Sequence, residues 1–221
     1  MSHASVIAAS EFFSGASPAV IDAIAAQADE RTLVRNDVLF NEGDAPDALY
    51  IVLSGRIAIA IDNTPLDSRE SVVALMITGD LFGDLALLDG GARSALARAL
   101  EPSKVLRIPY SAVEPQLRSN PDLLWAVTKV LAKRLRAMDE ALADSVFLDV
   151  TGRTAKRLLE LSGGVDEFSL PVTQEELAGM VGASRERVNK AIASFIRLGW
   201  LEQRDRQYKL LNRANLEQRA S

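Results

Sequence analysis

The sequence predicts an α+β protein built from three consecutive parts: a β jelly roll or barrel, a long helix, and a winged helix-turn-helix. Short alternations of apolar and polar residues, separated by turn signals, extend from about residue 31 to residue 109. A heptad pattern follows over residues 120–147, and two capped helices joined by a tight turn follow over residues 173–199. We therefore expect three domains, at residues 1–119, 120–148 and 149–221.

The first part contains short apolar runs that end at turn residues. Val38-Leu39-Phe40 precedes Glu42-Gly43-Asp44, residues 49–53 precede Ser54-Gly55, and residues 72–77 precede Gly79-Asp80. Ile57, Ile59 and Ile61 alternate with other residues, as expected for a strand with one buried face. This spacing is typical of antiparallel strands in a barrel or jelly roll. The Ala-rich stretch from Pro18 to Ala28 is predicted to form a helix that packs on it.

A long helix is predicted from Pro121 to about Phe147, with Asn120 as its cap and Pro121 at the first helical position. Its apolar seam has alternating spacings of four and three: Leu124, Thr128, Leu131, Leu135, Met138 and Leu142. The seam could pack on the chain's own barrel or against a second copy. It is narrow and flanked by the charged residues Lys133, Arg134, Arg136, Asp139 and Glu140, which favours a two-stranded coiled coil and hence a homodimer.

Signals for a winged helix-turn-helix follow. A helix can begin at Asp149, with Asp149 or Thr151 as its cap, and it ends at Ser162-Gly163-Gly164. Thr173 and Glu176 have capping-box spacing, Gly182 permits a turn, and Ser184 can cap the next helix. Gly199 ends that helix, and two short strands flank a turn at residues 204–206 as a wing.

The second helix of this motif has two chemically different faces. Val188, Ile192 and Phe195 repeat at i, i+4 and i+7 and are predicted to face the core. The opposite face carries Arg185, Glu186, Asn189 and Lys190. Arg can bond a guanine edge, a carboxylate can accept from cytosine, and Asn or Lys can reach adenine or guanine, so the pattern favours base contacts in a major groove. The alternative is a helical hairpin with a solvated charged face.

A second candidate site lies in the barrel, between Phe82 and Ala95. Glycines and small residues would let the backbone approach a ligand, Arg93 supplies a forked cation, and Ser94 supplies a hydroxyl, a pair suited to a phosphate diester. Asp84 could accept a bond from a sugar hydroxyl. The alternative is an Arg93 that pairs with Asp84 or Asp89 at the mouth of the barrel.

Composition excludes several kinds of chemistry. The 221 residues include no cysteine and one histidine, His3, which excludes disulfides, thiolate nucleophiles, iron–sulfur clusters and His-rich metal sites; we expect neither an enzyme nor a metal protein. No membrane span or signal peptide is apparent, so a cytoplasmic protein is expected. Residues 1–148 hold 13 basic and 20 acidic residues, and residues 149–221 hold 12 and 10, so a mild basic excess accompanies the helix-turn-helix.

The order of these parts resembles the cyclic AMP receptor protein and FNR family of bacterial transcription regulators over nearly the whole chain. The matching segments are residues 82–99, the hinge Phe147-Leu148-Asp149-Val150-Thr151-Gly152-Arg153, and Gly182-Ala183-Ser184-Arg185-Glu186-Arg187-Val188. The resemblance implies a cyclic-nucleotide-binding jelly roll, a dimerisation helix and a winged helix-turn-helix. It also implies a DNA-binding regulator that works as a homodimer on a roughly palindromic operator and contacts RNA polymerase, with no membrane partner.

By this resemblance the ligand-binding residues would be Gly83, Asp84, Leu85, Arg93 and Ser94 around the ribose and phosphate, with Met138 and Asp139 near the base. The DNA-binding residues would be Thr173, Gln174, Ser184, Arg185, Glu186, Arg187, Asn189 and Lys190. Three positions depart from the family pattern: Asp84 stands where a Glu is usual, and Met138-Asp139 stand where a pair of hydroxyl residues is usual. Cyclic AMP is the first expected ligand.

Other ligands and other functions are compatible with the same residues. Asp139 could accept from the amine of adenine or guanine, so cyclic GMP is an alternative, as is another phosphate-bearing signal. A regulator with a vestigial pocket would bind DNA constitutively. A nucleotide-binding subunit of an enzyme would not use the helix-turn-helix at all.

Overall fold

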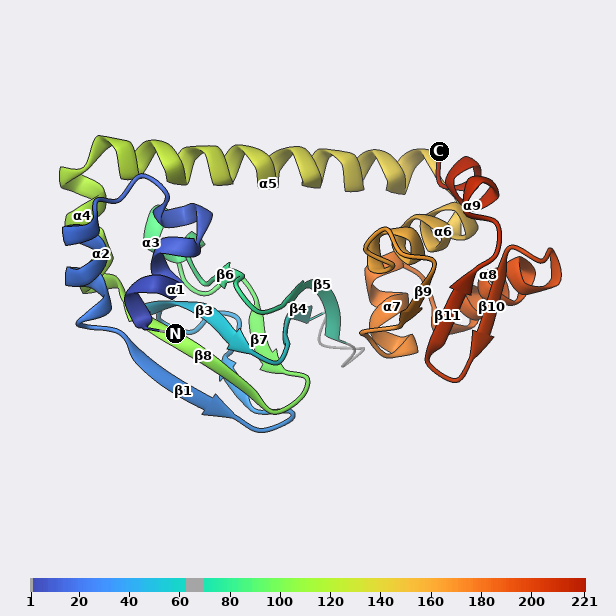
Figure 1. Cartoon of the computed structure of the whole chain (residues 1–221), viewed down its shortest axis with the longest axis horizontal. Helices are drawn as coiled ribbons and strands as arrows, with labels where there is room; N and C mark the ends of the chain where they lie inside the picture. Colours follow the sequence, from blue (N-terminus) through green and yellow to red (C-terminus); the bar gives the residue numbers. More distant parts are fainter. Residues whose placement is uncertain (1, 63–69) are drawn as a thin grey trace. The chain divides into compact units, whose positions relative to one another are not determined.

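The computed structural model describes residues 2–62 and 70–221, which form two compact units (Figure 1). The first unit ends at Leu135 and the second comprises Arg136–Ser221. The long helix α5, Pro121–Phe147, contributes its first half to one unit and its second half to the other. Each unit is described by itself below.

The described part of the first unit contains two four-stranded antiparallel sheets, which confirms the predicted jelly roll. The strands of one sheet, in spatial order, are β1 (Asp29–Leu33), β8 (Ser103–Pro109), β3 (Ala48–Ser54) and β6 (Leu81–Phe82). Those of the other are β2 (Val38–Phe40), β7 (Leu96–Ala99), β4 (Ile57–Asp62) and β5 (Glu70–Met76). The expected strands over residues 38–40, 49–53, 57–61 and 72–77 fall on β2, β3, β4 and β5.

Strand β3 is buried on both faces and joins two cores. Successive side chains of a strand point to opposite sides. Tyr50 and Val52 therefore pack between the two sheets, together with Phe82 and Val105. Leu49 and Ile51 face the other way, into a core covered by helices. This double burial explains why the run from residue 48 to 52 is continuously apolar rather than alternating.

Helices cover the outer face of the sheet that contains β3. They are α1 (His3–Ala9), the 3₁₀ turn η1 (Glu11–Phe13), α2 (Pro18–Ala25), α4 (Tyr110–Ser119) and the start of α5. Helix α2 ends at Ala25, three residues before the predicted end, because β1 begins at Asp29 and the chain needs a turn between them. Helix α4 was not predicted; its interior Pro115 makes the segment look non-helical in the sequence.

Helix α5 spans the range predicted for it. Leu123, Ala126 and Val127 are buried against the first unit. The heptad seam faces solvent along most of its length, and Leu135, Met138 and Leu142 are 60%, 68% and 64% exposed. A single copy of the chain therefore leaves this apolar stripe uncovered.

The second unit is a winged helix-turn-helix, as predicted. Its helices are α6 (Val150–Leu161), α7 (Gln174–Val181), α8 (Arg185–Arg197) and α9 (Arg213–Arg219). The strands β10 (Leu201–Arg204), β11 (Gln207–Leu210) and β9 (Glu167–Ser169) form one sheet in that order. Neither β9 nor α9 was predicted, because a three-residue strand and a two-turn helix are too short to show periodicity.

The predicted helix caps of this unit are present. Asp149, rather than Thr151, caps α6 by accepting from the Gly152 N–H. Thr173 and Glu176 form the capping box of α7, and Ser184 caps α8. Gly182 has φ +67°, a left-handed conformation that glycine adopts without strain.

Candidate functional sites

A cavity of about 190 Å³ opens in the jelly roll where the sequence places the phosphate segment. It lies between β6, α3 (Leu85–Asp89) and the chain that leads into β7. Its polar lining includes Gly83, Asp84, Arg93 and Ser94, together with Arg134 of α5. The apolar lining is Phe40, Ile59, Met76, Leu81, Phe82, Leu85, Ala86 and Ala95.

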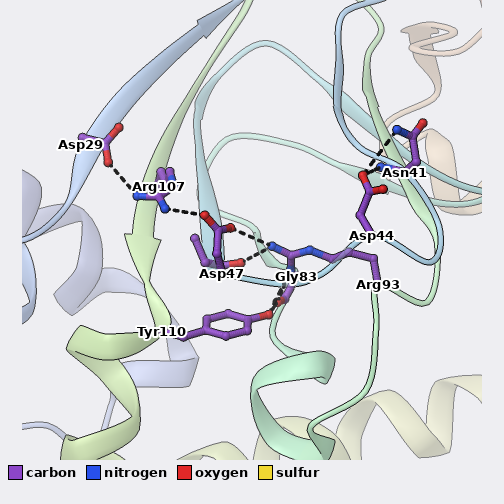
Figure 2. A network of polar contacts seen from close by, with 9 residues as sticks. Asp29, Asn41, Asp44, Asp47, Gly83, Arg93, Arg107 and Tyr110 are labelled. Carbon is purple, nitrogen blue, oxygen red and sulfur yellow. Dashed lines mark hydrogen bonds and ion pairs between the residues drawn. The ribbon is translucent and has the colours of Figure 1, made fainter.

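Arg93 is almost completely buried and is held by hydrogen bonds to the barrel itself. Its Nη2 donates to the Ala48 carbonyl at 2.6 Å, and its Nη1 donates to the Gly83 carbonyl at 2.9 Å and to the Tyr110 hydroxyl at 3.0 Å. Figure 2 shows the Arg93 side chain pointing towards Gly83 and Tyr110. Arg93 does not pair with Asp84 or Asp89, so the alternative suggested by the sequence is wrong for this side chain.

One donor of Arg93 is left without a partner. The guanidinium lies over the Phe40 ring, with Cζ 4.2 Å from the centroid, which stabilises the cation. Its Nε is buried and has no hydrogen-bond partner among the described residues. A buried unsatisfied donor is costly, and an anionic ligand in the cavity would satisfy it.

A series of ion pairs with neighbouring charged residues helps to fix the position of the Arg93 guanidinium. Asp47 lies 3.7 Å from Nη2 of Arg93 and accepts from Arg107 at 2.6 Å, and Arg107 also pairs with Asp29 (Figure 2). The hydrogen bond from Arg107 to Asp47 raises the pKa of the Arg107 guanidinium. Arg107 is thus held as a cation between two carboxylates.

Tyr110 joins the same cluster from the first residue of α4. Its hydroxyl donates to the Gly83 carbonyl and accepts from Arg93. Burial raises the pKa of Tyr110 to about 12, so the phenol remains a neutral donor at physiological pH. Tyr110 is a site residue that the sequence did not indicate, because it lies beyond the strand pattern and 17 positions from Arg93.

The backbone around Arg93 is equally constrained. The Arg93 N–H donates to the Asp44 carbonyl at 3.0 Å, and the Gly43 N–H donates to the Arg93 carbonyl at 2.8 Å. The Asp44 carboxylate accepts from the Asn41 N–H at 2.7 Å and closes this turn (Figure 2). On the opposite side Gly83 has φ +77°, and a Cβ there would lie 2.8 Å from Arg93 Nη1. Glycine is therefore required for the Arg93 side chain to reach the Gly83 carbonyl.

Asp84 is buried in an ion pair with a residue of the long helix. Both carboxylate oxygens accept from Nη1 of Arg134, at 2.8 and 3.0 Å, and Nη2 of Arg134 donates to the Leu81 carbonyl at 3.1 Å. The Asp84 side chain is 2% exposed and that of Arg134 is 39% exposed. In the sequence Arg134 was only a charge beside the heptad seam, since nothing local reveals a partner 50 residues away.

The remaining residues predicted to bind ligand differ in position. Ser94 and Leu85 are exposed and line the cavity. Met138 and Asp139 are exposed residues of α5 in the second unit and are not part of the cavity lining. The structure thus brings together Gly83, Asp84, Leu85, Arg93 and Ser94, and leaves the two helix residues outside this group.

Helix α8 has the two faces that its sequence predicts. Val188, Ile192 and Phe195 are at most 3% exposed. The polar residues of its first turns are all exposed: Arg185, Glu186, Arg187, Asn189 and Lys190. No hydrogen bond or ion pair of the Arg185 or Asn189 side chain is found among the described residues, so both side chains can meet an external partner.

Other residues of the predicted DNA face have internal partners. Glu186 pairs with Lys190 at 2.7 Å, and this bond lowers the pKa of the Glu186 carboxyl. The hydroxyls of Thr173 and Ser184 serve as helix caps. The Gln174 amide donates to the Tyr208 hydroxyl at 2.6 Å and links α7 to the wing strand β11.

Two family models match the chain. Residues 30–120 match the cyclic nucleotide-binding domain, and residues 152–219 match the Crp-like helix-turn-helix domain. The chain is 34% identical over 222 residues to a "CRP-like cAMP-activated global transcriptional regulator" from Mycobacterium tuberculosis strain H37Rv, covering 97% of this chain and 98% of the relative. The chain belongs to the cyclic AMP receptor protein and FNR family of transcription regulators. It is therefore a DNA-binding regulator rather than an enzyme.

More distant family members support the same assignment. A "cAMP-activated global transcriptional regulator CRP" from Salmonella typhimurium is 32% identical over 161 residues, covering 70% of this chain and 76% of the relative. The solved structure of the "c-di-GMP Responsive Global Regulator CLP" from Xanthomonas campestris has a TM-score of 0.74 and 26% identity, covering 88% of this chain and 99% of that one.

Two further observations concern residues 2–62 and 70–221 only. None of their helices has the length and apolar character needed to cross a membrane. They also contain no group of three or more carboxylate or histidine side chains that could hold a metal ion.

Proposed function

We propose that this regulator is a homodimer whose DNA binding is controlled by a cyclic nucleotide in the jelly-roll cavity, with cyclic AMP as the first candidate. The observation that carries the proposal is the unpartnered, buried Nε of Arg93, a residue that lines the cavity together with Ser94. A phosphate diester supplies the anionic acceptor that this donor lacks. The relative from Mycobacterium tuberculosis is named as cAMP-activated, which supports the choice of nucleotide.

The residues of the cavity fit the sugar and phosphate parts of such a ligand. Arg93 and Ser94 would hold the phosphate, and Asp84 would accept from a ribose hydroxyl while it remains paired with Arg134. A volume of about 190 Å³ lies below the usual range of roughly 300 to 1,000 Å³ for ligand pockets. We infer that the cavity holds the ribose phosphate and that the base extends beyond it.

The base would be recognised by residues further along α5. Met138 lies four residues, or about one helical turn, after Arg134 and therefore on the same face of the helix. Its thioether offers packing and weak acceptance, and Asp139 could accept from an exocyclic amine. Because adenine and guanine both carry such an amine, these residues leave cyclic GMP as the second candidate.

The uncovered seam of α5 supports the dimer. Leu135, Met138 and Leu142 are each more than half exposed in one copy and lie at heptad spacing, so a second α5 would bury them as a coiled coil. A two-fold dimer would present two copies of α8 to successive major grooves about 34 Å apart, which requires a roughly palindromic operator. RNA polymerase is the further partner we expect on such DNA.

For the nucleotide to act as a switch, it must bind the DNA-competent arrangement more tightly than other arrangements. Calorimetric titration of the full-length protein with cyclic AMP and with cyclic GMP tests the first half of this requirement. Fluorescence anisotropy on DNA enriched from a random pool, with and without each nucleotide, tests the second. We expect cyclic AMP to bind and to tighten DNA binding; absence of heat with both nucleotides would refute the nucleotide proposal.

A second function is favoured by one specific observation. Asp84 is already paired with Arg134, and both terminal nitrogens of Arg93 are already bonded within the barrel. With only Nε of Arg93 unpaired among these groups, the alternative is a structural pocket in a protein that binds DNA constitutively. Equal DNA affinity with and without added nucleotide would establish this alternative.

A further inference from the structure

The C-terminal helix α9 packs along α6 and is anchored at the far end of α6. Arg213, its first residue, donates from Nε to the Asp166 carboxylate at 2.9 Å and from Nη2 to the Val165 carbonyl at 2.8 Å. Leu216 is fully buried against the second unit, and Asn212 caps α9 by accepting from the Asn215 N–H at 3.1 Å. This end of α9 is therefore fixed to the turn that follows α6.

The other end of α9 is bound to the first turn of α6. Nη2 of Arg219 donates to both carboxylate oxygens of Asp149. The same carboxylate caps α6 by accepting from the Gly152 N–H at 2.8 Å. The Gly152 bond and the Arg219 pair both lower the pKa of Asp149, so the cap stays ionised. One side chain thus joins the start of α6 to the end of the chain.

Gly152 allows this contact because it has no side chain. A Cβ on Gly152 would lie 2.9 Å from the Arg219 carbonyl oxygen and 3.1 Å from its Nη1. Any larger residue would push the end of α9 away from α6. The close approach therefore requires a glycine in the first turn of α6.

Asp149 lies where the long helix ends and the DNA-binding helices begin. Only Leu148 and Asp149 separate α5 from α6, and Arg153 donates from Nη1 to the Leu148 carbonyl at 2.7 Å. A surface hollow is lined jointly by residues 149–151 and by Arg187 and Lys190 of α8. The first turn of α6 therefore lies beside the polar residues Arg187 and Lys190 of α8.

We propose that Arg219 is a positioning residue for DNA binding. Through Arg219, α9 holds Asp149 at the start of α6 and so sets the orientation in which α8 meets DNA. The inference rests on the proposed DNA-binding function but not on the identity of the nucleotide. The Arg219 and Asp149 side chains are 34% and 63% exposed, and pairs this exposed contribute little to global stability. Loss of the Arg219–Asp149 pair is therefore expected to change the orientation of α8 more than it changes the free energy of unfolding.

The test compares two arginines of the same short helix. Arg219→Gln removes the pair at Asp149, and the matched control Arg213→Gln removes the pair at Asp166. With saturating cyclic AMP and the DNA enriched by the wild-type protein, we expect Arg219→Gln to weaken DNA binding about fivefold or more, because fewer molecules hold the competent arrangement. Arg213→Gln should retain wild-type affinity, and Arg219→Lys should recover part of the loss.

A double-mutant cycle separates positioning from simple destabilisation. Asp149→Asn keeps a good helix cap but loses the ion pair, so it should reproduce the effect of Arg219→Gln, and the double variant should show no further loss. Calorimetric affinity for cyclic AMP should be unchanged in all of them. Wild-type affinity in Arg219→Gln, or an equal loss in Arg213→Gln, would overturn the inference. Absence of DNA binding by the wild-type protein would instead refute the proposed function.

Discussion

The pocket of the jelly roll and the polar face of α8 differ in how their key arginines are used. Arg93 is 4% exposed and bonded to two carbonyls of the barrel and to the Tyr110 hydroxyl of α4, whereas Arg185 is exposed and has no side-chain partner in the described part of the chain. The first is fixed before any ligand arrives, and the second is free to adapt to DNA. The comparison indicates that the pocket depends on contacts distant in sequence, while the DNA face depends on one helix.

The largest effect is expected from Arg93→Ala. The change removes the buried cation at residue 93 and leaves the Ala48 and Gly83 carbonyls without their donor. Each hydrogen bond to a charged group contributes roughly 1.5–3 kcal/mol, so affinity for cyclic AMP should fall by at least about 100-fold. Calorimetry measures the loss.

The matched control for this prediction is Arg118→Ala, which removes an exposed arginine of α4 that pairs with Glu114. It should bind cyclic AMP like the wild-type protein. The far-ultraviolet circular dichroism of both variants should show a folded chain. Retained affinity in a folded Arg93→Ala variant would contradict the role of Arg93 and remove the contrast between the two regions.

The next largest effect is expected at the apolar seam of α5, along which two copies of the chain would form the dimer. Leu135→Glu puts a charge into the predicted coiled coil, where burial of an unpaired carboxylate is unfavourable, so the dimer should dissociate about tenfold more readily or worse. Ala137→Glu is the control, because residue 137 is exposed and off the seam. Sedimentation equilibrium distinguishes them; equal dimerisation of the two variants would contradict a dimer formed along α5.

The sequence predicted the features that depend on neighbouring residues better than those that depend on residues distant in the chain. The caps at Asp149, Thr173 and Ser184 and the two faces of α8 depend on residues within one or two turns, and all were predicted. Gly83, Asp84, Arg93 and Ser94 of the pocket were also found, because they lie within one short segment of the sequence. Their partners Arg134 and Tyr110 were not, because the pairing arises only when α5 and α4 pack on the barrel.

A smaller effect is expected on the DNA face itself. Arg185→Ala removes a free guanidinium at the start of α8 and should relax the preference for one base pair of each half-site, at a cost of about 1–3 kcal/mol. Arg197→Ala, at the exposed C-terminal end of the same helix, is the control and should leave base preference unchanged. Anisotropy with operator variants tests this. Unchanged discrimination by Arg185→Ala would mean that the residue contacts phosphate rather than base.

The smallest effect tests whether the pocket is fixed in the absence of ligand. Burial raises the pKa of Tyr110 to about 12, above its ordinary value of 10, so the folded state holds this proton more tightly than the unfolded state. The resulting stabilisation is complete below pH 10 and is lost as the pH rises towards 12. Between these values the unfolding free energy should fall by on the order of 1 kcal/mol, after a discount for solvent screening. Urea unfolding at several pH values should show a smaller fall in Tyr110→Phe, which lacks the titrating hydroxyl. Identical pH profiles would show that the phenol is not buried in the folded state, and that the pocket is less closed than its hydrogen bonds indicate.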